Sequence, residues 1–295
     1  MKNWIAIINR RAGGLRSPHE HERIADKLRQ FGAEVAFTER PGHAQELARR
    51  ASGAEGIAVA GGDGTLLEVL NGAAGAAPRL AVIPTGRGNS LARDLGVFPV
   101  AHALECLHSS RVTRVDLIEV LFDDIGRARR RLLSASTVAL GYPAAVVRSA
   151  GAHFRRLGGY CYAAAAVCLR PRPVAMRIAE ETAAAPRSSL TGLVVNNTRH
   201  LGNFLSLPHA SCRDGSLDVM ELRAGYWRQC AHNVSMLSGL QFYTPARLGR
   251  ARSLALTLSE PHDLMVDGEL FAGVVSLNVR IQPAAIEFVC GGVEA

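Results

Sequence analysis

The sequence predicts an α/β protein of two domains, a parallel-sheet domain followed by a mostly antiparallel β-rich domain. Three observations predict this class. Strand and helix patterns alternate over the first hundred or so residues, and β-rich segments dominate after about Arg111. The chain has 295 residues, of which 48% are hydrophobic, and this length fits two domains better than one. We expect the domains at residues 1–112 and 113–295, and the last strand is a candidate to return to the first domain.

The first domain should contain four strands joined by helices. Strands are predicted at residues 4–8, 34–38, 56–60 and 80–83. The first helix should begin after Ser17, which is followed by Pro18 and by Glu20 three residues later, and it should end at Gly32. Further helices are predicted at residues 44–51, 65–71 and 89–95. Such alternation indicates a parallel sheet covered on both faces, which is a three-layer domain.

The second domain should be mostly antiparallel. Turn signals such as Asp123–Gly126 and Asp267-Gly268 separate several of its apolar segments. Helices are expected to interrupt it at residues 160–170 and 226–240, and the boundary with the first domain should lie near residues 111–116. Strands are predicted at residues 115–122, 132–140, 174–179, 190–196, 217–222, 254–258, 264–266, 274–281 and 285–290.

Composition limits the function classes. The net charge of +8 favours an anionic partner such as a nucleic acid, a membrane surface or a phosphorylated ligand. We expect no nucleic acid, because aromatic residues are few and no stacking motif accompanies the arginines. The six cysteines are scattered without metal-ligand spacing, which favours a reducing cytoplasm. The most apolar internal stretch, residues 157–169, is too short to span a bilayer, and no signal peptide is apparent.

A glycine corner follows the third predicted strand. Gly61, Gly62 and Gly64 precede a helix, so backbone N–H groups can point at one anion without obstruction from side chains. The stretch is neither a Walker A loop nor GxGxxG. Asp63 would repel a phosphate unless a metal ion bridges them or Asp63 holds a network together, so a magnesium nucleotide is implied. The alternative is a plain turn in which Asp63 caps the helix.

A second corner follows the fourth predicted strand. Gly86 and Gly88 again lie just ahead of a helix. Because neighbouring parallel strands end at the same edge of a sheet, the two corners should line one crevice, where open α/β sheets bind ligands.

The two corners carry a specific resemblance. "GGDGTLLEVLNG" followed by "IPTGRGNSLARDLG" resembles the diacylglycerol kinase catalytic-domain family, which includes sphingosine and ceramide kinases and bacterial lipid kinases. Further stretches match the family's motifs in the same order along nearly the whole chain: "NRRAGG", "LGGYCYAAAAVCLRPRP", "RDGSLDVMEL" and "VDGELF". The resemblance implies ATP-dependent phosphorylation of a lipid hydroxyl at a membrane surface. It places the reaction in a cleft between the α/β domain and a β-sandwich domain.

The resemblance also implies site residues. Glu269 corresponds to the proton acceptor, with Asp267 beside it and Asp63 as a third catalytic carboxylate. A Mg²⁺ ion would be held by Asp214, with backbone carbonyls at Ser211 and Ser216. From the residues alone, Asp-Gly is the commonest hairpin turn signal, and Asp214 is equally compatible with a turn former. Nucleotide contacts are implied for Thr38, Gly61, Gly62, Asp63, Gly64, Thr65, Leu66, Leu67, Glu68, Gly86, Arg87 and Asn89.

Three segments leave alternatives open. Arg87 stands where the family has a small hydroxyl residue, and its guanidinium could bind phosphate oxygens or point into solvent. The basic run Arg127, Arg129, Arg130 and Arg131 follows a turn and is either a solvated hairpin tip or an attraction for anionic lipid. The apolar helix predicted at 160–170 is either a buried helix or a wall of a lipid pocket.

Three functions therefore compete. The first is a lipid kinase that uses ATP and Mg²⁺. Such a kinase would be a cytoplasmic protein that associates peripherally with the inner face of the membrane. The second is a soluble-substrate kinase of related fold, such as an NAD kinase, whose own nicotinamide-site motif we do not find. The third is a non-catalytic sensor of nucleotides or anionic lipids, which the intact "VDGELF" disfavours. Diacylglycerol, phosphatidylglycerol, a sphingoid base and ceramide all fit as the acceptor. The oligomeric state is open, with a homodimer among the options.

Overall fold

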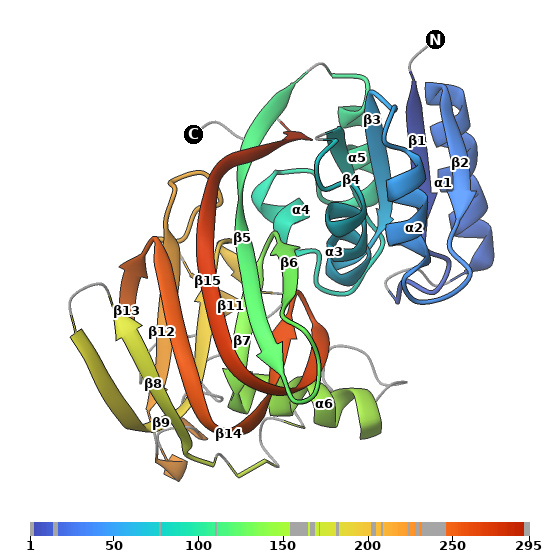
Figure 1. The fold of residues 1–295 in the computed structure, drawn as a ribbon. Helices are drawn as coiled ribbons and strands as arrows, with labels where there is room; N and C mark the ends of the chain where they lie inside the picture. Colours follow the sequence, from blue (N-terminus) through green and yellow to red (C-terminus); the bar gives the residue numbers. More distant parts are fainter. Residues whose placement is uncertain are drawn as a thin grey trace. The chain divides into compact units, whose positions relative to one another are not determined.

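The structure is a computed structural model in which the chain forms two compact units. One comprises Met1–Leu117 and Pro283–Ala295, and the other Ile118–Gln282. Strands β5 (Val112–Asp124) and β15 (Glu269–Val289) each run from one unit into the other (Figure 1). The described residues are 3–13, 17–76, 78–109, 111–153, 165, 169–170, 172–180, 183–201, 205–207, 209–223, 225–227, 230–231 and 246–291.

The first unit is built on a parallel sheet. Strands β1 (Trp4–Ile8), β2 (Ala33–Phe37), β3 (Gly56–Gly61) and β4 (Arg79–Pro84) lie in the order β2-β1-β3-β4. The end of β15 adds beside β4, also in parallel, with Phe288 opposite Leu80. Each of the four strands lies within one residue of its predicted bounds, so this part of the fold is confirmed.

Helices cover both faces of this sheet. α1 (Pro18–Phe31) leads from β1 to β2, whereas α2 (His43–Arg50) and α3 (Asp63–Gly72) lead back across the sheet to β3 and β4. Because such crossovers are right-handed, α1 lies on one face and α2 and α3 lie on the other. α2 and α3 pack so closely that a Cβ on Gly72 would lie 2.3 Å from the carbonyl oxygen of Gln45. Two shorter helices follow β4: α4 (Ser90–Asp94) and α5 (Val100–Cys106).

Local signals set the bounds of α1. The side chain of Ser17 accepts a hydrogen bond from the backbone N–H of His19, and Glu20 reaches back to the N–H of Ser17. The helix ends at Gly32, whose φ of 96° lies in the left-handed region that favours glycine. The predicted capping box and stop are confirmed.

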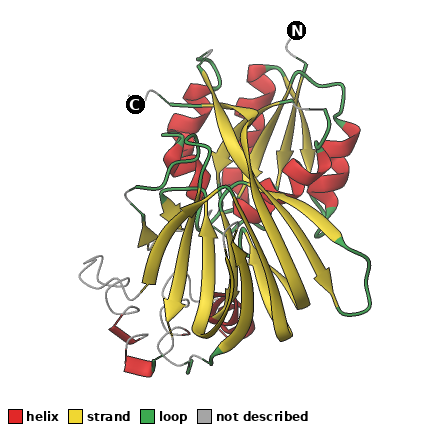
Figure 2. Cartoon of the chain, turned by 60° about the vertical axis from the view of Figure 1, so that its left-hand side comes forward, coloured by secondary structure: helices red, strands yellow, loops and turns green. Residues whose placement is uncertain are grey.

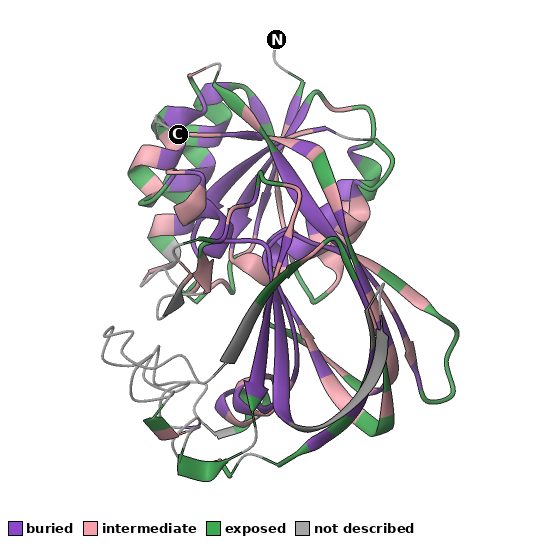
Figure 3. Ribbon diagram, turned by 90° about the vertical axis from the view of Figure 1, so that its left-hand side faces the viewer, coloured by how far each residue is buried: buried purple, intermediate pink, exposed green. Residues whose placement is uncertain are grey.

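The second unit is antiparallel in all the strand pairs recorded for its described residues (Figure 2). Its sheet runs in the order β13-β12-β9-β7-β14-β15, while β8 pairs with β9 and β14, and β5 pairs with β6 and β15. Buried residues run along the strands of each unit (Figure 3). The elements are β6 (Arg130–Ser134), β7 (Thr137–Gly141), α6 (Tyr142–His153), β8 (Val174–Glu180), β9 (Ala183–Asn196), β10 (His200–Leu201), β11 (Leu205–Ser206), β12 (Leu217–Arg223), β13 (Ala246–Ala251) and β14 (Ser253–Val266).

One predicted strand is wrong. Residues 132–140 form two strands, β6 and β7, which are separated at Ala135 and Ser136. The backbone N–H groups of Ala135, Ser136 and Thr137 all donate to the carboxylate of Asp267, at 3.0, 3.1 and 2.8 Å. This convergence on one side chain interrupts the strand, because those N–H groups turn away from a sheet partner.

Two predicted breaks between strands are also wrong. Residues 254–258 and 264–266 belong to one strand, β14, whose register with β15 shifts between Thr257 and His262. Pro261 lies in this interval and has no N–H to donate, so the chain bulges and continues as a strand. Residues 274–281 and 285–290 likewise join in β15, which contains Ala284 at a φ of 49°. The helices predicted at 160–170 and 226–240 lie largely outside the described residues.

A buried carboxylate ties three strands of the second unit together. Glu119 on β5 is 5% exposed and accepts hydrogen bonds from Arg131 on β6, at 2.6 Å, and from Nε of Arg280 on β15, at 3.0 Å. Desolvation by burial acts to raise the pKa of Glu119, but the bonds from the two guanidinium groups outweigh it and lower the pKa below its ordinary value.

Glu119→Gln is expected to lower the free energy of unfolding by about 2 kcal/mol at pH 7, because two arginines lose their shared anion. A lowered pKa in the folded state means that the stabilisation is present above the ordinary glutamate pKa of about 4.3. The stabilisation is lost as the pH falls through the pKa of the folded state. Urea unfolding at pH 7 and pH 3 should therefore show the two proteins converging at low pH. An equal difference at both pH values would contradict this assignment.

Candidate active site

Three loops meet at the carboxyl edge of the parallel sheet in the first unit. The chain moves from β1 to β2 in one direction and from β3 to β4 in the other, so the order reverses between β1 and β3. Open α/β sheets bind ligands at such a point. Backbone hydrogen bonds hold the loops together there. Asn9 N donates to Ala60 O at 2.9 Å, and Thr85 N and Gly86 N donate to Gly61 O at 3.1 and 3.2 Å.

The two glycine corners are in direct backbone contact. A Cβ on Gly86 would lie 2.3 Å from the Cα of Gly62, and a Cβ on Gly62 would lie 3.0 Å from the Cα of Gly86. The first distance is far below an ordinary carbon contact and involves backbone that cannot move aside. Glycine is therefore required at residue 86 for the loops after β3 and β4 to meet.

Asp63 joins the two corners. It lies in the first turn of α3, which begins at Asp63, two residues earlier than predicted. Its Oδ1 accepts from the backbone N–H of Ser90 at 2.9 Å, at the start of α4. This hydrogen bond matches the interpretation in which Asp63 holds a network together.

The loop after β1 is tied to α3 by Asn9. Its Nδ2 donates to Oγ1 of Thr65 at 2.9 Å, and its Oδ1 accepts from the backbone N–H of Arg11 at 2.9 Å. Sequence reasoning matched "NRRAGG" to a family motif but assigned no role to Asn9. In the structure, Asn9 holds the loop after β1 against the start of α3, next to the first glycine corner.

Glu68 acts on a different loop. Its two carboxylate oxygens accept from the backbone N–H groups of Gly42, at 2.9 Å, and Ala44, at 3.0 Å, at the start of α2. It thereby fixes the segment that follows Thr38, whose N–H donates to Ile8 O at 2.9 Å. The side chains of Leu66 and Leu67 are buried, so any nucleotide contact there is left to the backbone.

The loop after β4 is shaped by Asn89 and carries Arg87. Asn89 has a φ of 54°, and its amide both accepts from Gly86 N at 3.0 Å and donates to Gly86 O at 2.7 Å. Arg87 is exposed, and its guanidinium lies against the loop after β1, because a Cβ on Gly13 would lie 2.7 Å from its Nε. A cationic group thus stands beside the meeting point of the loops.

In the second unit, the predicted catalytic acids lie at a two-residue hairpin turn. Asp267 and Gly268, with φ of 46° and 89°, connect Val266 of β14 to its partner Glu269 of β15. Positive φ at both central residues is typical of the tight turns favoured in hairpins. Glu269 is exposed, whereas Asp267 is buried.

Asp267 is fully engaged in holding this turn. Besides the three backbone N–H groups of residues 135–137, it accepts from Oγ of Ser134 at 2.8 Å. Burial raises the pKa of the Asp267 carboxyl, and the four donors act against this rise. Asn197 supports the same segment by donating to Ala135 O at 3.0 Å. Sequence reasoning missed this segment, although the small hydroxyl residues of "SAST" inside a predicted strand were a signal of it.

The metal site implied at Asp214 does not fit the arrangement of its residues. Oδ1 of Asp214 accepts from the backbone N–H of Ser216 at 3.0 Å, and Oδ2 accepts from Nη2 of Arg250 at 2.9 Å. The same guanidinium donates to His209 O at 2.7 Å, and its Nε lies 3.5 Å from Oδ1 of Asp218. A guanidinium therefore already pairs with the one carboxylate that the implied site would use. Within the described residues, no group of three His, Cys, Asp or Glu side chains could hold a metal ion.

Arg250→Met is expected to lower the Tm by about 2–4 °C, because the tie between Asp214, Asp218 and the carbonyl of His209 is lost. In the variant, millimolar Mg²⁺ without nucleotide should restore part of the loss by neutralising the two carboxylates. The Tm of the wild type should not change with Mg²⁺ at constant ionic strength. A wild-type Tm that rises with Mg²⁺ while the variant's does not would contradict the placement of Arg250.

Comparisons with known proteins agree with this architecture. A family model described as the diacylglycerol kinase catalytic domain matches residues 3–120. A second, described as the YegS C-terminal NAD kinase beta sandwich-like domain, matches residues 136–290. A search of curated proteins found no match. Within the described residues, no helix is long and apolar enough to cross a membrane.

Solved structures with the same fold come from Bacillus anthracis str. Sterne. One, of a protein assigned as a diacylglycerol kinase, has a TM-score of 0.79 at 20% identity and covers 99% of this chain and 98% of that chain. Another, of a diacylglycerol kinase, has a TM-score of 0.77 at 21% identity, with 99% and 98% covered. At this level of identity, the likeness establishes the shared fold.

Proposed function

Because this chain belongs to the diacylglycerol kinase catalytic-domain family, we propose that it transfers the γ-phosphate of ATP to a hydroxyl group of a membrane lipid. One observation carries the proposal beyond family membership. Two glycine corners are held in backbone contact where the strand order of a parallel sheet reverses, beside the start of α3 and the guanidinium of Arg87.

On the nucleotide side, the chain offers an anion cradle. The first-turn N–H groups of a helix lack acceptors within the helix and carry partial positive charge, so the start of α3 at Asp63 and Gly64 suits phosphate oxygens. Arg87 would add a full positive charge to the same loops and bind oxygens through two donors. Three polar side chains would hold these loops in place. Asp63 joins the start of α3 to the start of α4, and Asn9 joins the loop after β1 to α3. Asn89 bonds to Gly86 and so shapes the loop after β4.

Mg²⁺ would enter with ATP as part of the substrate and neutralise charge on its phosphates. The described residues of the first unit offer Asp63 as a carboxylate at the cradle. No step is assigned to a metal at Asp214, because Arg250 stands there.

On the acceptor side, Glu269 would take the proton of the attacking lipid hydroxyl. Its carboxylate is exposed, and the turn that carries it is fixed by the four hydrogen bonds to Asp267. Phosphoryl transfer needs little covalent help from the protein beyond positioning, charge stabilisation and this proton transfer. Asp267 would be a positioning residue, because all its described contacts lie within the turn and the segment that holds it.

The protein would work in the cytoplasm and dock on the inner face of the membrane, where both ATP and a lipid hydroxyl are available. The test is to incubate it with γ-labelled ATP, Mg²⁺ and mixed micelles of diacylglycerol, phosphatidylglycerol, sphingosine or ceramide, with NAD as a soluble acceptor. Label in one lipid supports the proposal and names the acceptor. Label in NAD alone would instead show that the protein is a kinase of a soluble substrate.

Gly86→Ala is expected to weaken ATP binding at least tenfold, because its Cβ would force Gly62 away and separate the two corners. The matched control is Gly53→Ala in the same unit, since a Cβ there would meet nothing within 4 Å. Titration calorimetry with a non-hydrolysable ATP analogue compares the two variants. Equal affinities would show that the nucleotide does not use the contact between these loops.

A further inference from the structure

Positive charge is concentrated in the second unit. Residues 118–282 hold 19 arginines and 12 acidic residues, a net charge of +7. Residues 1–117 and 283–295 hold 15 lysines and arginines and 14 acidic residues, a net charge of +1, which completes the total of +8. The attraction for an anionic partner therefore belongs to the β-rich unit, apart from the loops of the proposed nucleotide cradle.

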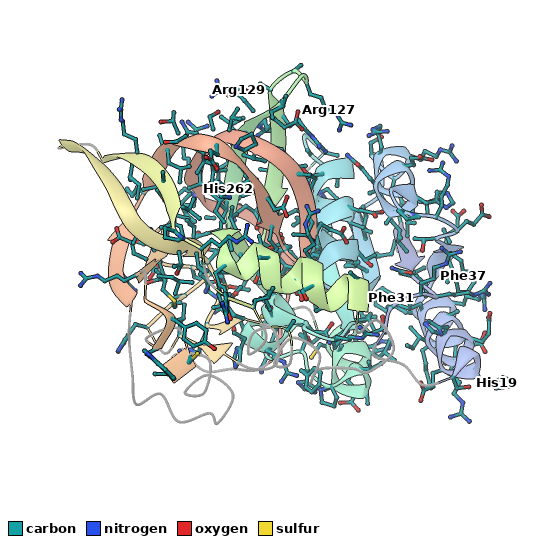
Figure 4. The ribbon with its side chains drawn as sticks, turned by 90° about the horizontal axis from the view of Figure 1, so that it is seen from below. His19, Phe31, Phe37, Arg127, Arg129 and His262 are labelled. Atoms are coloured by element: carbon teal, nitrogen blue, oxygen red, sulfur yellow. The ribbon has the colours of Figure 1, made fainter. Side chains whose placement is uncertain are left out.

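The basic run between β5 and β6 does not account for this attraction. Arg127 and Arg129 point outward from the turn (Figure 4). Arg129 and Arg130, however, pair with Asp123 and Asp124, and Arg131 pairs with Glu119. These acidic partners cancel most of the charge of the hairpin locally, which favours the solvated hairpin tip over a lipid-binding patch.

Unpaired arginines gather instead at one end of the second unit's sheet. Val174, where β8 begins, and Arg223, where β12 ends, both lie opposite Leu190 of β9. Two strand spacings of about 4.8 Å separate their backbones. Arg172 and Arg170 precede β8 at this end. Within the described part of the chain, Arg170, Arg172 and Arg223 are exposed and make no ion pair.

Two exposed aromatic side chains follow β12 at the same end. Tyr226 is 46% exposed and Trp227 is 81% exposed, and their rings contact edge to face with centroids 5.4 Å apart. Trp227 is the most exposed of the large hydrophobic residues recorded for the described chain. Trp and Tyr are enriched where proteins meet the headgroup region of a bilayer, because one part of each ring system is apolar and another is polar.

We propose that Arg170, Arg172, Arg223, Tyr226 and Trp227, the docking rim, bind the surface of an anionic lipid bilayer. The arginines supply attraction to the headgroups, and the two aromatic rings insert at the interface. The proposal deepens the proposed function and rests on it for its purpose, which is to bring a lipid kinase to its substrate. Its geometry is independent of catalysis, so binding can be tested without turnover.

The two tryptophans make the test specific. Trp4 is 5% exposed and packs against Phe31 in the first unit, so only Trp227 can report on contact with lipid. With vesicles of phosphatidylglycerol and phosphatidylcholine, the emission of the wild type should shift to the blue and be quenched by lipids brominated in their acyl chains. Pure phosphatidylcholine should give a weaker response. Trp227→Phe should lose the shift, because its remaining tryptophan is buried.

Charge variants measure the electrostatic part. A triple variant replaces the three arginines of the docking rim by Gln: Arg170, Arg172 and Arg223. Its affinity for the anionic vesicles, measured by co-sedimentation, should fall on the order of 100-fold, at roughly fivefold for each arginine. The matched control changes the same number of charges on exposed arginines elsewhere in the second unit, and it should weaken binding much less. That control replaces Arg127, Arg213 and Arg252 by Gln.

Several results would overturn the proposal. They are absence of vesicle binding, binding without any change in Trp227 emission, or equal losses in the rim and control variants. Binding of nucleic acid or an acidic protein through the same arginines, without lipid binding, would also replace it. A water-soluble short-chain lipid separates this proposal from the proposed function. Rim variants that phosphorylate this soluble lipid but do not phosphorylate lipid in vesicles support docking. Binding of the wild type to vesicles without phosphate transfer to any lipid would support docking but would exclude the lipid kinase activity.

Discussion

Glu269→Gln is expected to lower kcat by about 10²–10⁴-fold while leaving the affinity for ATP unchanged. The amide keeps the size of the side chain but cannot accept the proton of the lipid hydroxyl, and general base catalysis contributes about that factor. Because Glu269 is exposed at a hairpin turn, the substitution should not alter folding. Steady-state transfer from γ-labelled ATP, with ATP affinity measured by calorimetry, gives both quantities.

The matched control is Glu260→Gln, which removes another exposed carboxylate from the same unit. Its kcat should stay within about twofold of the wild type, since surface charge changes of this kind have small effects. If Glu269→Gln and Glu260→Gln turn over equally well, Glu269 is not the proton acceptor.

Asp267→Ala is expected to lower the free energy of unfolding by about 4 kcal/mol. Its buried carboxylate accepts hydrogen bonds from four donors, three of them backbone N–H groups, and each donor left without an acceptor costs about 1–3 kcal/mol before the structure relaxes. Turnover should also fall, because the turn that carries Glu269 loses its anchor. Urea unfolding followed by circular dichroism measures the change in stability.

The neighbouring acid provides the comparison for this effect. Glu269→Ala changes a carboxylate two residues away in the same hairpin, yet it should alter the free energy of unfolding by less than about 0.5 kcal/mol. We thus expect Asp267 to control stability and Glu269 to control turnover. A small change in stability for Asp267→Ala would mean that the four donors find other acceptors and that Asp267 does not fix the turn.

Much of the first unit could be predicted because its signals are local. Ser17, Glu20 and Gly32 specify the bounds of α1 within fifteen residues of one another. The strands of the parallel sheet are buried apolar runs, and they lie within one residue of their predicted bounds. The geometry of parallel sheets predicts that the two glycine corners lie at one edge of the sheet. It does not predict the backbone contact between Gly62 and Gly86.

The rest depends on residues that are distant in the sequence. Asp267 accepts bonds from residues about 130 positions earlier, and nothing near either segment reveals the pairing. Arg250 lies 36 positions after Asp214, so its pairing with this predicted metal ligand could not be seen in the sequence either. Helix α6 was missed although Pro143 stands near its start, where proline is favoured.

The most direct test of the proposed lipid kinase is to follow where the labelled phosphate goes. Wild type and Glu269→Gln are incubated side by side with γ-labelled ATP and mixed micelles of the four lipids, and each mixture is extracted with organic solvent. We expect label in the organic phase for the wild type and at least 100-fold less for the variant. Label that stays in the aqueous phase for both proteins, as ATP, free phosphate or a phosphorylated soluble acceptor, would contradict the proposed lipid kinase activity.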